Sequence, residues 1–437
     1  MLNDLLFVLK DYWEFVLVEV NKREIYEWFL FIFPFFVFGE TPRYILPAVV
    51  TSAAHLLGYL GRPGRRTQAF LESRPTVSIV VAAHNEQDVI VDNLTSLVEL
   101  PYENKEIVVV DDHSDDDTYA LARPFADRGE IKLIRNDSPS GRGGRPFATN
   151  LGVRASTGQF VISVDADTTF DLGTIHRMLE PFADPEVGAV SGNLKVANRH
   201  ANAVTACQAC EYLESITLWK TWTSMIGTLL QASGAFGAYR RSALERVGLW
   251  DPELAEDADL SSKLRKAGYK IRFARDAVAF THVPDNLQAL TLQRKRWAHG
   301  FLRTYFRKHR DAMSVKRFGW ANFLELLQEF IMQILMPFGY VIYLLLMLVF
   351  FPAYLPFILA LVYIVYVLTN VLLLVSAISV SERRSEEWGL LWFVVVMPVY
   401  KSYFKWVRIT SFVKEFFRKS YTDPYLPETV WNQAPRW

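Results

Sequence analysis

The chain has 437 residues, and its 47 Lys plus Arg equal its 47 Asp plus Glu, so the formal net charge is zero. This length accommodates one large or two ordinary domains together with membrane segments. The charge balance argues against a nucleic-acid partner, because nucleic-acid-binding proteins usually carry a basic excess. Aromatic residues make up 14% of the chain and gather near both ends, which is typical of membrane interfaces.

Residues 1–66 form a first, membrane-associated zone. Its apolar runs, 28–38 and 44–60, are short for a bilayer crossing, which needs about 20 residues. They are either two tight spans or one span preceded by an interfacial helix. The basic segment 61–66 ends this zone, and by the positive-inside tendency it places the following domain in the cytosol. Charged residues interrupt the first apolar stretch, so no cleavable signal peptide is expected.

Residues 67–315 are predicted to form an α/β domain, because short apolar runs alternate with helical segments. The expected strands are 77–82, 106–110, 131–134 and 160–164, and the expected helices are 86–100, 116–126 and 146–156. Nearly continuous apolar strands predict a mostly parallel sheet that is covered on both faces. Ligands of such sheets bind at the carboxyl ends of the strands, so polar residues at those ends are candidates for a site.

Residues 316–419 are predicted to be interfacial and transmembrane helices, and residues 420–437 a tail. Runs 329–350 and 354–378 are long enough to span a bilayer. The other expected segments are an interfacial helix 316–330, a charged loop 381–387, a third apolar run 388–400 and an interfacial helix 401–419. Three spans would leave the C-terminus outside, whereas the positive charge of 401–419 is expected inside. A shallow hairpin near Pro398 would reconcile the two.

Two cysteines, Cys207 and Cys210, are the only ones in the chain, so no disulfide framework is available. Their C-x-x-C spacing suggests redox chemistry or half of a zinc site. The sequence has no further cysteines to complete a zinc site, and no strand–turn context precedes the pair. We therefore expect two small residues one helical turn apart.

Acidic residues follow two of the predicted strands. Asp112 comes after strand 106–110, where an acidic side chain commonly accepts hydrogen bonds from a nucleoside, although turns and helix caps use aspartate equally well. Asp165 and Asp167 follow strand 160–164, and carboxylates at i and i+2 on extended backbone point to the same side. They repel each other unless a divalent cation lies between them, and a diphosphate can complete the shell of that ion.

Two further patterns lie downstream. Asp257 precedes a helix that runs through Leu264, as a general base for an acceptor hydroxyl or as an acidic residue stabilised by the helix dipole. Gln293, Arg296 and Trp297 share one helix face at i, i+3 and i+4. Arginine there can neutralise a leaving diphosphate, and tryptophan offers a flat face to a sugar ring. The alternative for that pair is an interfacial membrane anchor.

Together these segments resemble glycosyltransferase family 2, specifically its processive membrane branch of cellulose, chitin, hyaluronan, poly-N-acetylglucosamine and rhizobial chitooligosaccharide synthases. The resemblance covers roughly residues 75–305. The matching segments are VSIVVAAHNE (77–86), IVVVDDHSDDDT (107–118), VDADT (164–168), SGAFGAYRRSAL (233–244), AEDADLSSKL (255–264), VPDNL (283–287) and QRKRW (293–297). Their order along the chain makes the resemblance specific.

The resemblance implies a GT-A fold and an inverting transfer from a nucleotide sugar, UDP-glucose or UDP-N-acetylglucosamine, with Mg²⁺ or Mn²⁺. Asp257 would be the general base. The implied donor-binding residues are Ala82, His84, Glu86, Asp112, Arg145, Asp165 and Asp167, the last two also holding the metal. The implied residues for the acceptor and the diphosphate are Gln293, Arg296, Trp297, Gly234, Phe236 and Glu256.

Some positions depart from the family pattern. Arg145 stands where relatives usually carry lysine, which keeps the positive charge and adds bidentate geometry. His84 replaces an aromatic residue, and Ala255 replaces a threonine. The F-x-V-T gating motif of cellulose synthases is missing after the catalytic zone. The segment 431–437, with Trp431 and Trp437, is a candidate substitute lid, and truncation after residue 429 tests it.

Three functions remain open. The first is a polymerase that elongates, and exports, a β-linked polysaccharide at the plasma or inner membrane. Because its membrane zone is small, a homo-oligomer or an accessory subunit would complete an export pore. The second transfers one sugar to a membrane lipid, as ceramide glucosyltransferases do. The third, an inactive sugar-binding scaffold, is disfavoured because every carboxylate that the chemistry requires is present. The complete Q-x-x-R-W pattern favours the first.

Overall fold

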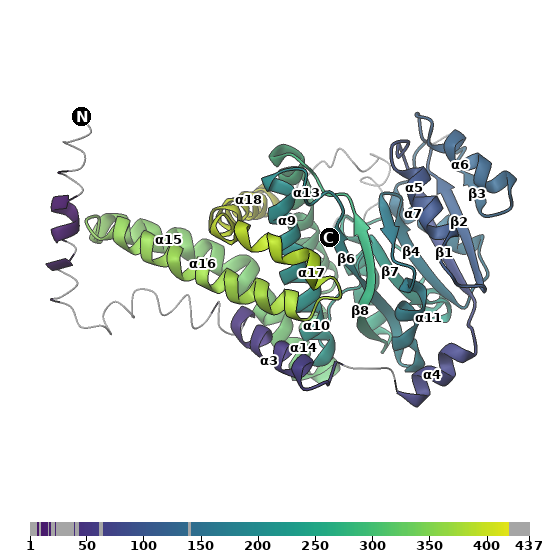
Figure 1. Ribbon diagram of the computed structural model, residues 1–437, viewed down its shortest axis with the longest axis horizontal. Coiled ribbons are helices and arrows are strands. Elements are labelled where there is room, and N and C mark those ends of the chain that lie inside the picture. Colours follow the sequence, from purple (N-terminus) through teal and green to yellow (C-terminus); the bar gives the residue numbers. More distant parts are fainter. Residues whose placement is uncertain are drawn as a thin grey trace.

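A computed structural model describes residues 43–60, 64–138 and 141–418, together with isolated residues before residue 43. The apolar run 28–38, part of the basic segment 61–66 and the C-terminal tail with its candidate lid lie outside the described residues. Figure 1 shows a sheet domain from which a pair of long helices projects.

An eight-stranded sheet forms the centre of the domain, in the order β3-β2-β1-β4-β7-β6-β8-β5. Strands β1, β2, β3 and β4 pair in parallel, as do β6 and β8, whereas β7 runs antiparallel to both β4 and β6 and β5 runs antiparallel to β8. The predicted α/β, mostly parallel sheet is confirmed. The strands are β1 (Val77–Ala83), β2 (Lys105–Asp111), β3 (Lys132–Arg135), β4 (Phe160–Asp165), β5 (Thr168–Phe170), β6 (Val187–Val196), β7 (Phe236–Arg240) and β8 (Lys270–Thr281).

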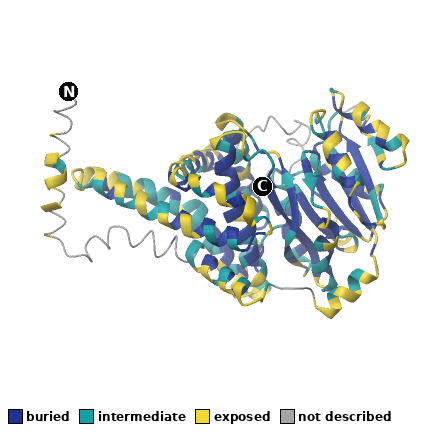
Figure 2. Ribbon diagram, in the orientation of Figure 1, coloured by how far each residue is buried: buried dark blue, intermediate teal, exposed yellow. Residues whose placement is uncertain are grey.

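The central strands are buried from end to end, as Figure 2 shows, because helices cover both faces. The helices of this domain are α4 (Arg65–Glu72), α5 (Ile90–Val98), α6 (Thr118–Asp127), α7 (Arg145–Arg154), α8 (Thr174–Leu179), α9 (Ala203–Tyr212), α10 (Trp219–Met225), α11 (Arg241–Val247), α12 (Glu256–Lys266) and α13 (Leu287–Phe301). Helix α5 begins four residues later than predicted. Asn85 has a positive φ of 57°, and the Glu86 N–H donates to Thr118 Oγ1 at 2.7 Å, so residues 84–89 form a loop.

Cys207 and Cys210 both lie buried on α9 with free thiols. Burial raises the pKa of the Cys207 thiol to about 11 and raises the pKa of the Cys210 thiol as well. Thiols in this environment stay protonated and unreactive at neutral pH. The pair is therefore part of the core, as the sequence indicated.

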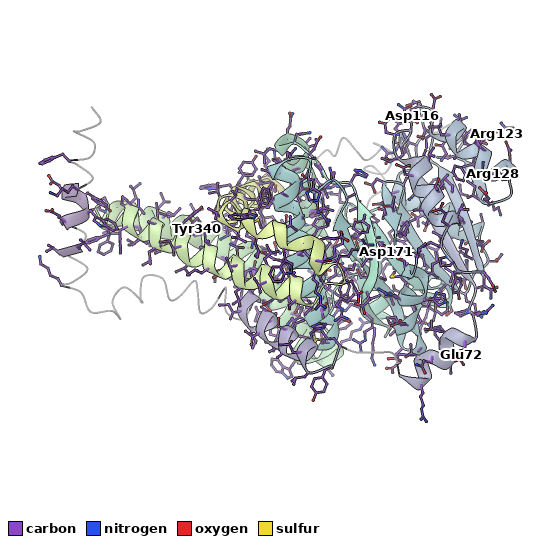
Figure 3. All side chains as sticks on the ribbon, viewed as in Figure 1. Glu72, Asp116, Arg123, Arg128, Asp171 and Tyr340 are labelled. Carbon is purple, nitrogen blue, oxygen red and sulfur yellow. The ribbon has the colours of Figure 1, made fainter. Side chains whose placement is uncertain are left out.

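Two helices are long and apolar enough to cross a membrane, Val315–Phe350 and Leu355–Ser379. The first joins α14 (Val315–Phe330) to α15 (Met336–Phe350) without the break expected near residue 330, and the second is α16. Within α14, Gly319 has a φ of 81° and leaves the helical conformation. Figure 3 shows Tyr340 on this projecting pair of helices. Charged residues such as Arg123 and Arg128 lie at the opposite end of the molecule, on the surface of the sheet domain.

The apolar run 388–400, one of three downstream segments whose crossing of the bilayer the sequence left open, does not form one continuous α-helix. Residues Trp388–Val395 form a short 3₁₀ helix, and α18 (Met397–Arg418) begins directly after it. The charged loop before this segment returns to the sheet domain, where Glu387 pairs with Lys195 at 2.8 Å and Arg383 pairs with Asp171. The two candidate spans therefore form a hairpin whose two ends both lie next to the sheet domain. Helix α18 packs against α13 beside these ends.

Helix α18 has the amphipathic character predicted for 401–419. Phe404, Val407 and Phe412 are buried against the domain, whereas Trp406 and Phe416 are exposed on the opposite face. An exposed stripe of large apolar side chains next to two candidate spans is typical of a helix at a bilayer surface. The side of the membrane on which α18 lies stays a prediction.

Candidate active site

The carboxyl ends of β1, β2 and β4 bring the first group of predicted residues together. Ala82 on β1 is directly opposite Asp165 on β4. Asp112, which follows β2, is buried and accepts hydrogen bonds from the N–H groups of Gly143 at 3.0 Å and Gly144 at 2.6 Å. The His84 Nδ1 lies 2.9 Å from the Asp112 carbonyl oxygen. Asp112 therefore positions the glycine loop that leads into α7, and His84 borders the same strand end.

Three carboxylates converge beside this loop. Burial and the charges of Asp167 and Asp165 raise the pKa of Glu86 to about 7. Burial and the charge of Asp165 likewise raise the pKa of Asp167 to about 6. Thr168 and Thr281 donate hydrogen bonds to the Asp167 carboxylate at 3.1 and 3.2 Å. These groups repel one another, and a divalent cation would relieve that repulsion.

Arg145 links this acidic group to the next strand end. Its Nε donates to Asp165 Oδ1 at 2.7 Å, and its Nη1 donates to Glu256 Oε1 at 2.9 Å. Its Nη2 donates to the Gly234 carbonyl oxygen. Burial lowers the pKa of Arg145, but the charges of Asp165 and Glu256 more than offset this, so the pKa is raised. The substitution of arginine for the usual lysine thus supplies a fork that joins three chain segments.

Asp257 sits in the first turn of α12, where the sequence placed a base. Its Oδ2 accepts from the Gly234 N–H at 3.1 Å, and its Oδ1 accepts from the Ala258 N–H at 2.8 Å. A Cβ on Gly234 would lie 3.4 Å from the Asp257 carboxylate, so a larger side chain would cover this group. Glu256 beside it has a raised pKa, because burial and the charge of Asp257 together outweigh its pairing with Arg145 and the field of Arg296.

Helix α13 carries the Q-x-x-R-W face. Gln293 is half-buried, and its Oε1 has no hydrogen-bond partner among the residues that the structure describes. Arg296 lies close enough to Glu256 to interact with its charge. The Trp297 ring is 43% exposed, and the Arg294 guanidinium stacks on it 4.2 Å from the ring centroid. An unpaired amide oxygen and an exposed ring on one face are suited to a ligand with hydroxyl groups.

One predicted residue lies apart from this group. Phe236 is completely buried in the core and packs edge-on against Phe170 at 5.3 Å, over the space left by Gly192. Among the other predicted residues, contacts form a row at the strand ends from Ala82 and Asp165 through Arg145 to Gly234, Glu256 and Asp257, and the charge of Arg296 reaches Glu256. The contribution of Phe236 to the acceptor site stays a prediction.

Two residues that the sequence did not single out lie in this row. His282 follows β8, and its Nδ1 lies 3.5 Å from the Asp167 carbonyl oxygen. Lys220 on α10 donates to Ser191 Oγ at 2.9 Å, and burial lowers its pKa to about 8 while the charge of Asp257 opposes that shift. The sequence could have revealed His282, because it is a polar residue directly after an apolar strand. No pattern in the sequence indicated Lys220, because only the packing of α10 over β6 brings this residue near Asp257.

The donor set fits a hard divalent cation without completing its shell. Across residues 43–60, 64–138 and 141–418, no three His, Cys, Asp or Glu side chains form a ready set of metal ligands. Asp165 and Asp167 offer oxygen ligands, and the raised pKa of Asp167 indicates that its negative charge lacks compensation. Oxygen ligands and room for phosphate oxygens are what Mg²⁺ and Mn²⁺ require.

Comparison with known proteins agrees with this geometry. The family model described as "Glycosyltransferase like family 2" matches residues 75–300, more than half of the chain. The chain is 33% identical over 244 residues to a poly-β-1,6-N-acetyl-D-glucosamine synthase of Staphylococcus aureus, covering 55% of this chain and 58% of that protein. It is 33% identical over 226 residues to the synthase of the same name in Staphylococcus epidermidis, covering 51% and 54%. The chain thus spans little more than half the length of these relatives.

A solved structure extends the likeness beyond the sheet domain. The mannosyltransferase of Pyrobaculum calidifontis, determined with GDP-mannose and Mn²⁺, superposes with a TM-score of 0.55 at 23% identity. The superposition covers 86% of this chain and 99% of that one. The expected GT-A-like arrangement, followed by two apolar helices that could span a membrane, is thereby confirmed.

Proposed function

Because the chain belongs to glycosyltransferase family 2, we propose that it is an inverting polysaccharide synthase that adds sugar from a UDP-sugar to a growing β-linked chain at the membrane. The observation that carries this proposal is the fork of Arg145, which holds the Asp165 end of the site against Glu256 and the Gly234 carbonyl beside Asp257. Donor phosphates and acceptor hydroxyl would then meet within one connected group of residues.

The donor would bind at the strand ends of β1, β2 and β4. Ala82, His84 and Asp112 would border the nucleoside, and the glycine loop before α7 would approach the diphosphate. Asp165 and Asp167 would hold Mg²⁺ or Mn²⁺ with the diphosphate, and the His282 ring lies beside the Asp167 carbonyl oxygen. The cation would neutralise charge on the leaving UDP. Arg145 and Arg296 would contribute positive charge on the protein side.

Asp257 would take the proton of the acceptor hydroxyl as that oxygen attacks the anomeric carbon and UDP leaves. The N–H groups of Gly234 and Ala258 hold the two carboxylate oxygens of Asp257 in place. Such preorganisation orients a general base towards the acceptor hydroxyl. The exposed Trp297 ring would support the acceptor sugar, with Gln293 beside it, so that the chain end returns to the same position after each addition.

The similarity to poly-β-1,6-N-acetyl-D-glucosamine synthases supports UDP-N-acetylglucosamine as the first donor to test. The pair of apolar helices and the exposed apolar stripe of α18 support a membrane location with the catalytic domain in the cytosol. A homo-oligomer or an accessory subunit would complete an export path.

The test incubates membranes containing the full chain with radiolabelled UDP-sugars and separates products by size and by partition into organic solvent. A polymer made from one donor is the expected result. Asp257→Asn should reduce turnover by at least about a thousandfold, the order typical for an essential acid–base group. The exposed residue Asp127 supplies the control Asp127→Asn, which should leave turnover unchanged.

The second candidate function, transfer of one sugar to a membrane lipid, predicts a labelled product in the organic phase and no polymer. That outcome would replace the polymerase. Full activity of Asp257→Asn would remove the proposed base. Failure to release nucleotide from any UDP-sugar tested would favour the inactive sugar-binding scaffold instead.

A further inference from the structure

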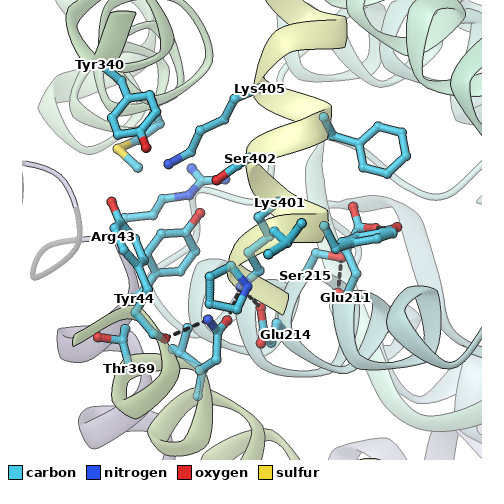
Figure 4. A pocket seen from close by; sticks show the side chains of 18 of the residues that line it. Arg43, Tyr44, Glu211, Glu214, Ser215, Tyr340, Thr369, Lys401, Ser402 and Lys405 are labelled. Carbon is cyan, nitrogen blue, oxygen red and sulfur yellow. Dashed lines mark hydrogen bonds and ion pairs between the residues drawn. The ribbon is translucent and has the colours of Figure 1, made fainter. Parts of the chain in front are cut away.

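A cavity of about 480 Å³ lies between the candidate spans and α18, away from the sheet edge that holds the carboxylates. Its apolar wall comes from α15 and α16, with Tyr340, Leu359 and Tyr363 among the lining residues. Its polar wall comes from α18. Figure 4 shows Lys401 and Lys405 projecting into this space from α18, with Arg43 and Tyr340 facing them.

The polar wall is cationic for a reason visible in the helix. Lys401, Lys405 and Arg408 are spaced at i, i+4 and i+7, so they share one face of α18. That face turns inward to the cavity, whereas the apolar stripe with Trp406 turns outward. The sequence predicted that these charges belong to an interfacial helix whose positive charge lies on the inner side of the membrane. The structure gathers them around this cavity.

Positive charge in the cavity exceeds the negative charge that faces it. Among the described residues that line the cavity, four are cationic, Arg43, Lys401, Lys405 and Arg408, and two are acidic, Glu211 and Glu214. Behind the wall, Glu329 and Glu325 act on Arg43 and Arg294 pairs with Glu211, which leaves an excess of one positive charge among these described groups. Charges withdrawn from water are costly unless an opposite charge accompanies them. An anionic ligand would supply that charge.

Individual pairings place the excess near Arg408. Lys401 donates to Glu214 at 2.6 Å and also to Asn370, and Arg43 pairs with Glu329 while stacking on Trp219 at 4.2 Å. Arg408 makes no ion pair or hydrogen bond with any part of the chain that the structure describes. Burial lowers its pKa, and the neighbouring charge of Arg43 contributes to this.

Lys405 lies on the other side of the cavity from these pairs. Its Nζ is 5.2 Å from the Tyr340 ring centroid and 5.0 Å from that of Tyr366. A cation between two rings that belong to membrane-spanning helices is held at the level where a lipid headgroup would meet its acyl chains. The cavity therefore has a cationic end that would face the headgroup of a lipid and an apolar end that would face its acyl chains.

We propose that this cavity binds the phosphate headgroup of a membrane lipid, with Arg408 and Lys405 as its cationic ligands and the α15–α16 wall against its hydrocarbon. Two nitrogen donors of Arg408 suit a phosphate in bidentate geometry. The inference rests on the membrane location in the proposed function. It does not rest on sugar transfer, so binding is measured without any donor.

Hydrogen bonds and ring stacking connect the cavity to Trp297, the proposed acceptor-binding residue. Glu211, which lines the cavity, accepts from Arg294 Nη2 at 2.8 Å and from the Tyr400 hydroxyl at 2.7 Å. Arg294 in turn stacks on Trp297. An occupant of the cavity would thus lie next to residues that orient the ring of Trp297, and it would stabilise α18 against α13.

The experiment uses the full chain purified in detergent and native mass spectrometry to count bound lipid. Phosphatidylglycerol and a polyprenyl monophosphate are the anionic probes, and phosphatidylcholine is the matched zwitterionic lipid. One tightly retained anionic lipid, and none of the phosphatidylcholine, is expected. Arg408→Gln should weaken retention roughly tenfold, the effect of losing charge-assisted hydrogen bonds.

Matched lysines on the same helix provide the controls. Lys405→Gln should weaken retention, whereas Lys414→Gln, at an exposed position outside the cavity, should not. Arg408→Lys should bind the anionic lipid more tightly than Arg408→Gln does. If Arg408→Gln folds poorly, the weaker lipid retention of Lys405→Gln tests the proposal instead.

Equal retention of both lipid classes, or retention unchanged in Arg408→Gln and Lys405→Gln, would overturn the proposal. Displacement of the lipid by millimolar inorganic phosphate would assign the cavity to a free anion and overturn the lipid assignment. Displacement by a neutral N-acetylglucosamine oligomer would make the cavity a path for the product instead. Lipid retention in a preparation that transfers no sugar would uphold this inference even though the proposed function failed.

Discussion

Replacing Arg145 by glutamine tests whether one side chain holds the two halves of the site together. Its guanidinium reaches the end of β4 through Asp165, the head of α12 through Glu256, and the loop before β7 through the Gly234 carbonyl. The side chain is 22% exposed, so most of it is withdrawn from water. Glutamine would leave the two carboxylates without the cation that separates them.

The magnitude follows from those contacts. Breaking a buried charge pair by removing one partner costs about 3–5 kcal/mol. The Asp165 side chain is 36% exposed, so solvent screens part of that interaction and the low end, about 3 kcal/mol, is appropriate. A displacement of catalytic groups by an ångström costs about a hundredfold in rate. We therefore expect a loss of at least about a hundredfold in kcat, and a rise in KM for the donor because Asp165 is no longer held.

The assay measures release of UDP by the full chain in detergent, together with the midpoint of thermal unfolding. Arg145→Lys keeps the charge but not the fork, so it should lose about tenfold in kcat and less stability than Arg145→Gln. Arg154→Gln, at the exposed end of the same helix α7, is the matched control and should change neither quantity. Activity within twofold of wild type in Arg145→Gln, with an unchanged midpoint, would refute the bridging role.

Three other predictions concern charge and pH. The raised pKa values of Glu86 and Asp167 mean that their contribution to stability is present below about pH 4 and is lost as the pH rises to about 7. Mn²⁺ should restore thermal stability at pH 8 over an EDTA control, and this gain should vanish in Asp167→Asn. Lys220, with its pKa lowered to about 8, should give kcat an alkaline limb near pH 8, and Lys220→Arg should move that limb above pH 9 in a pH–rate profile. The pKa of Glu415 falls to about 2, because hydrogen bonds from His299 and Arg303 outweigh the effect of burial. Its contribution to stability should therefore be lost only as the pH falls from about 4.5 towards 2. Glu415→Gln should lower the midpoint of thermal unfolding at pH 7 by a few degrees.

The sheet and the acidic strand ends could be predicted from local pattern alone. Nearly continuous apolar runs such as 77–82 and 160–164 have few alternatives to a buried parallel strand. A polar residue directly after such a run must lie at the edge of the sheet, which is why Asp112 and Asp165 were assigned there. The start of α5 was misplaced, because a single residue with positive φ, Asn85, delays the helix without changing its apolar pattern.

Other features depend on contacts between distant segments. Phe236 belongs to a motif whose neighbours face the site, yet it points into the core because the pleat of β7 alternates sides. The run 388–400 is apolar enough for a span. However, the loop before it is held to the sheet domain by the pairs Lys195–Glu387 and Arg199–Glu386, and the run itself folds into a short 3₁₀ helix followed by the start of α18. Hydropathy records neither constraint.

The junction of α13 with α18 connects these two sets of features. Glu415 on α18 is buried and accepts from His299 at 2.9 Å and from Arg303 at 3.1 Å, both downstream of Trp297. At the other end of the same helix, Tyr400 shares Glu211 with Arg294, on which the Trp297 ring stacks. Trp297 therefore lies between two contacts that α18 makes with the catalytic domain, the ionic contacts of Glu415 and the hydrogen bond from Tyr400 to Glu211. Because the outer face of α18 is apolar and its inner face is cationic, we expect the position of α18, and with it the geometry around Trp297, to depend on the bilayer. Detergents that strip lipid from α18 should consequently raise KM for the acceptor more than KM for the UDP-sugar.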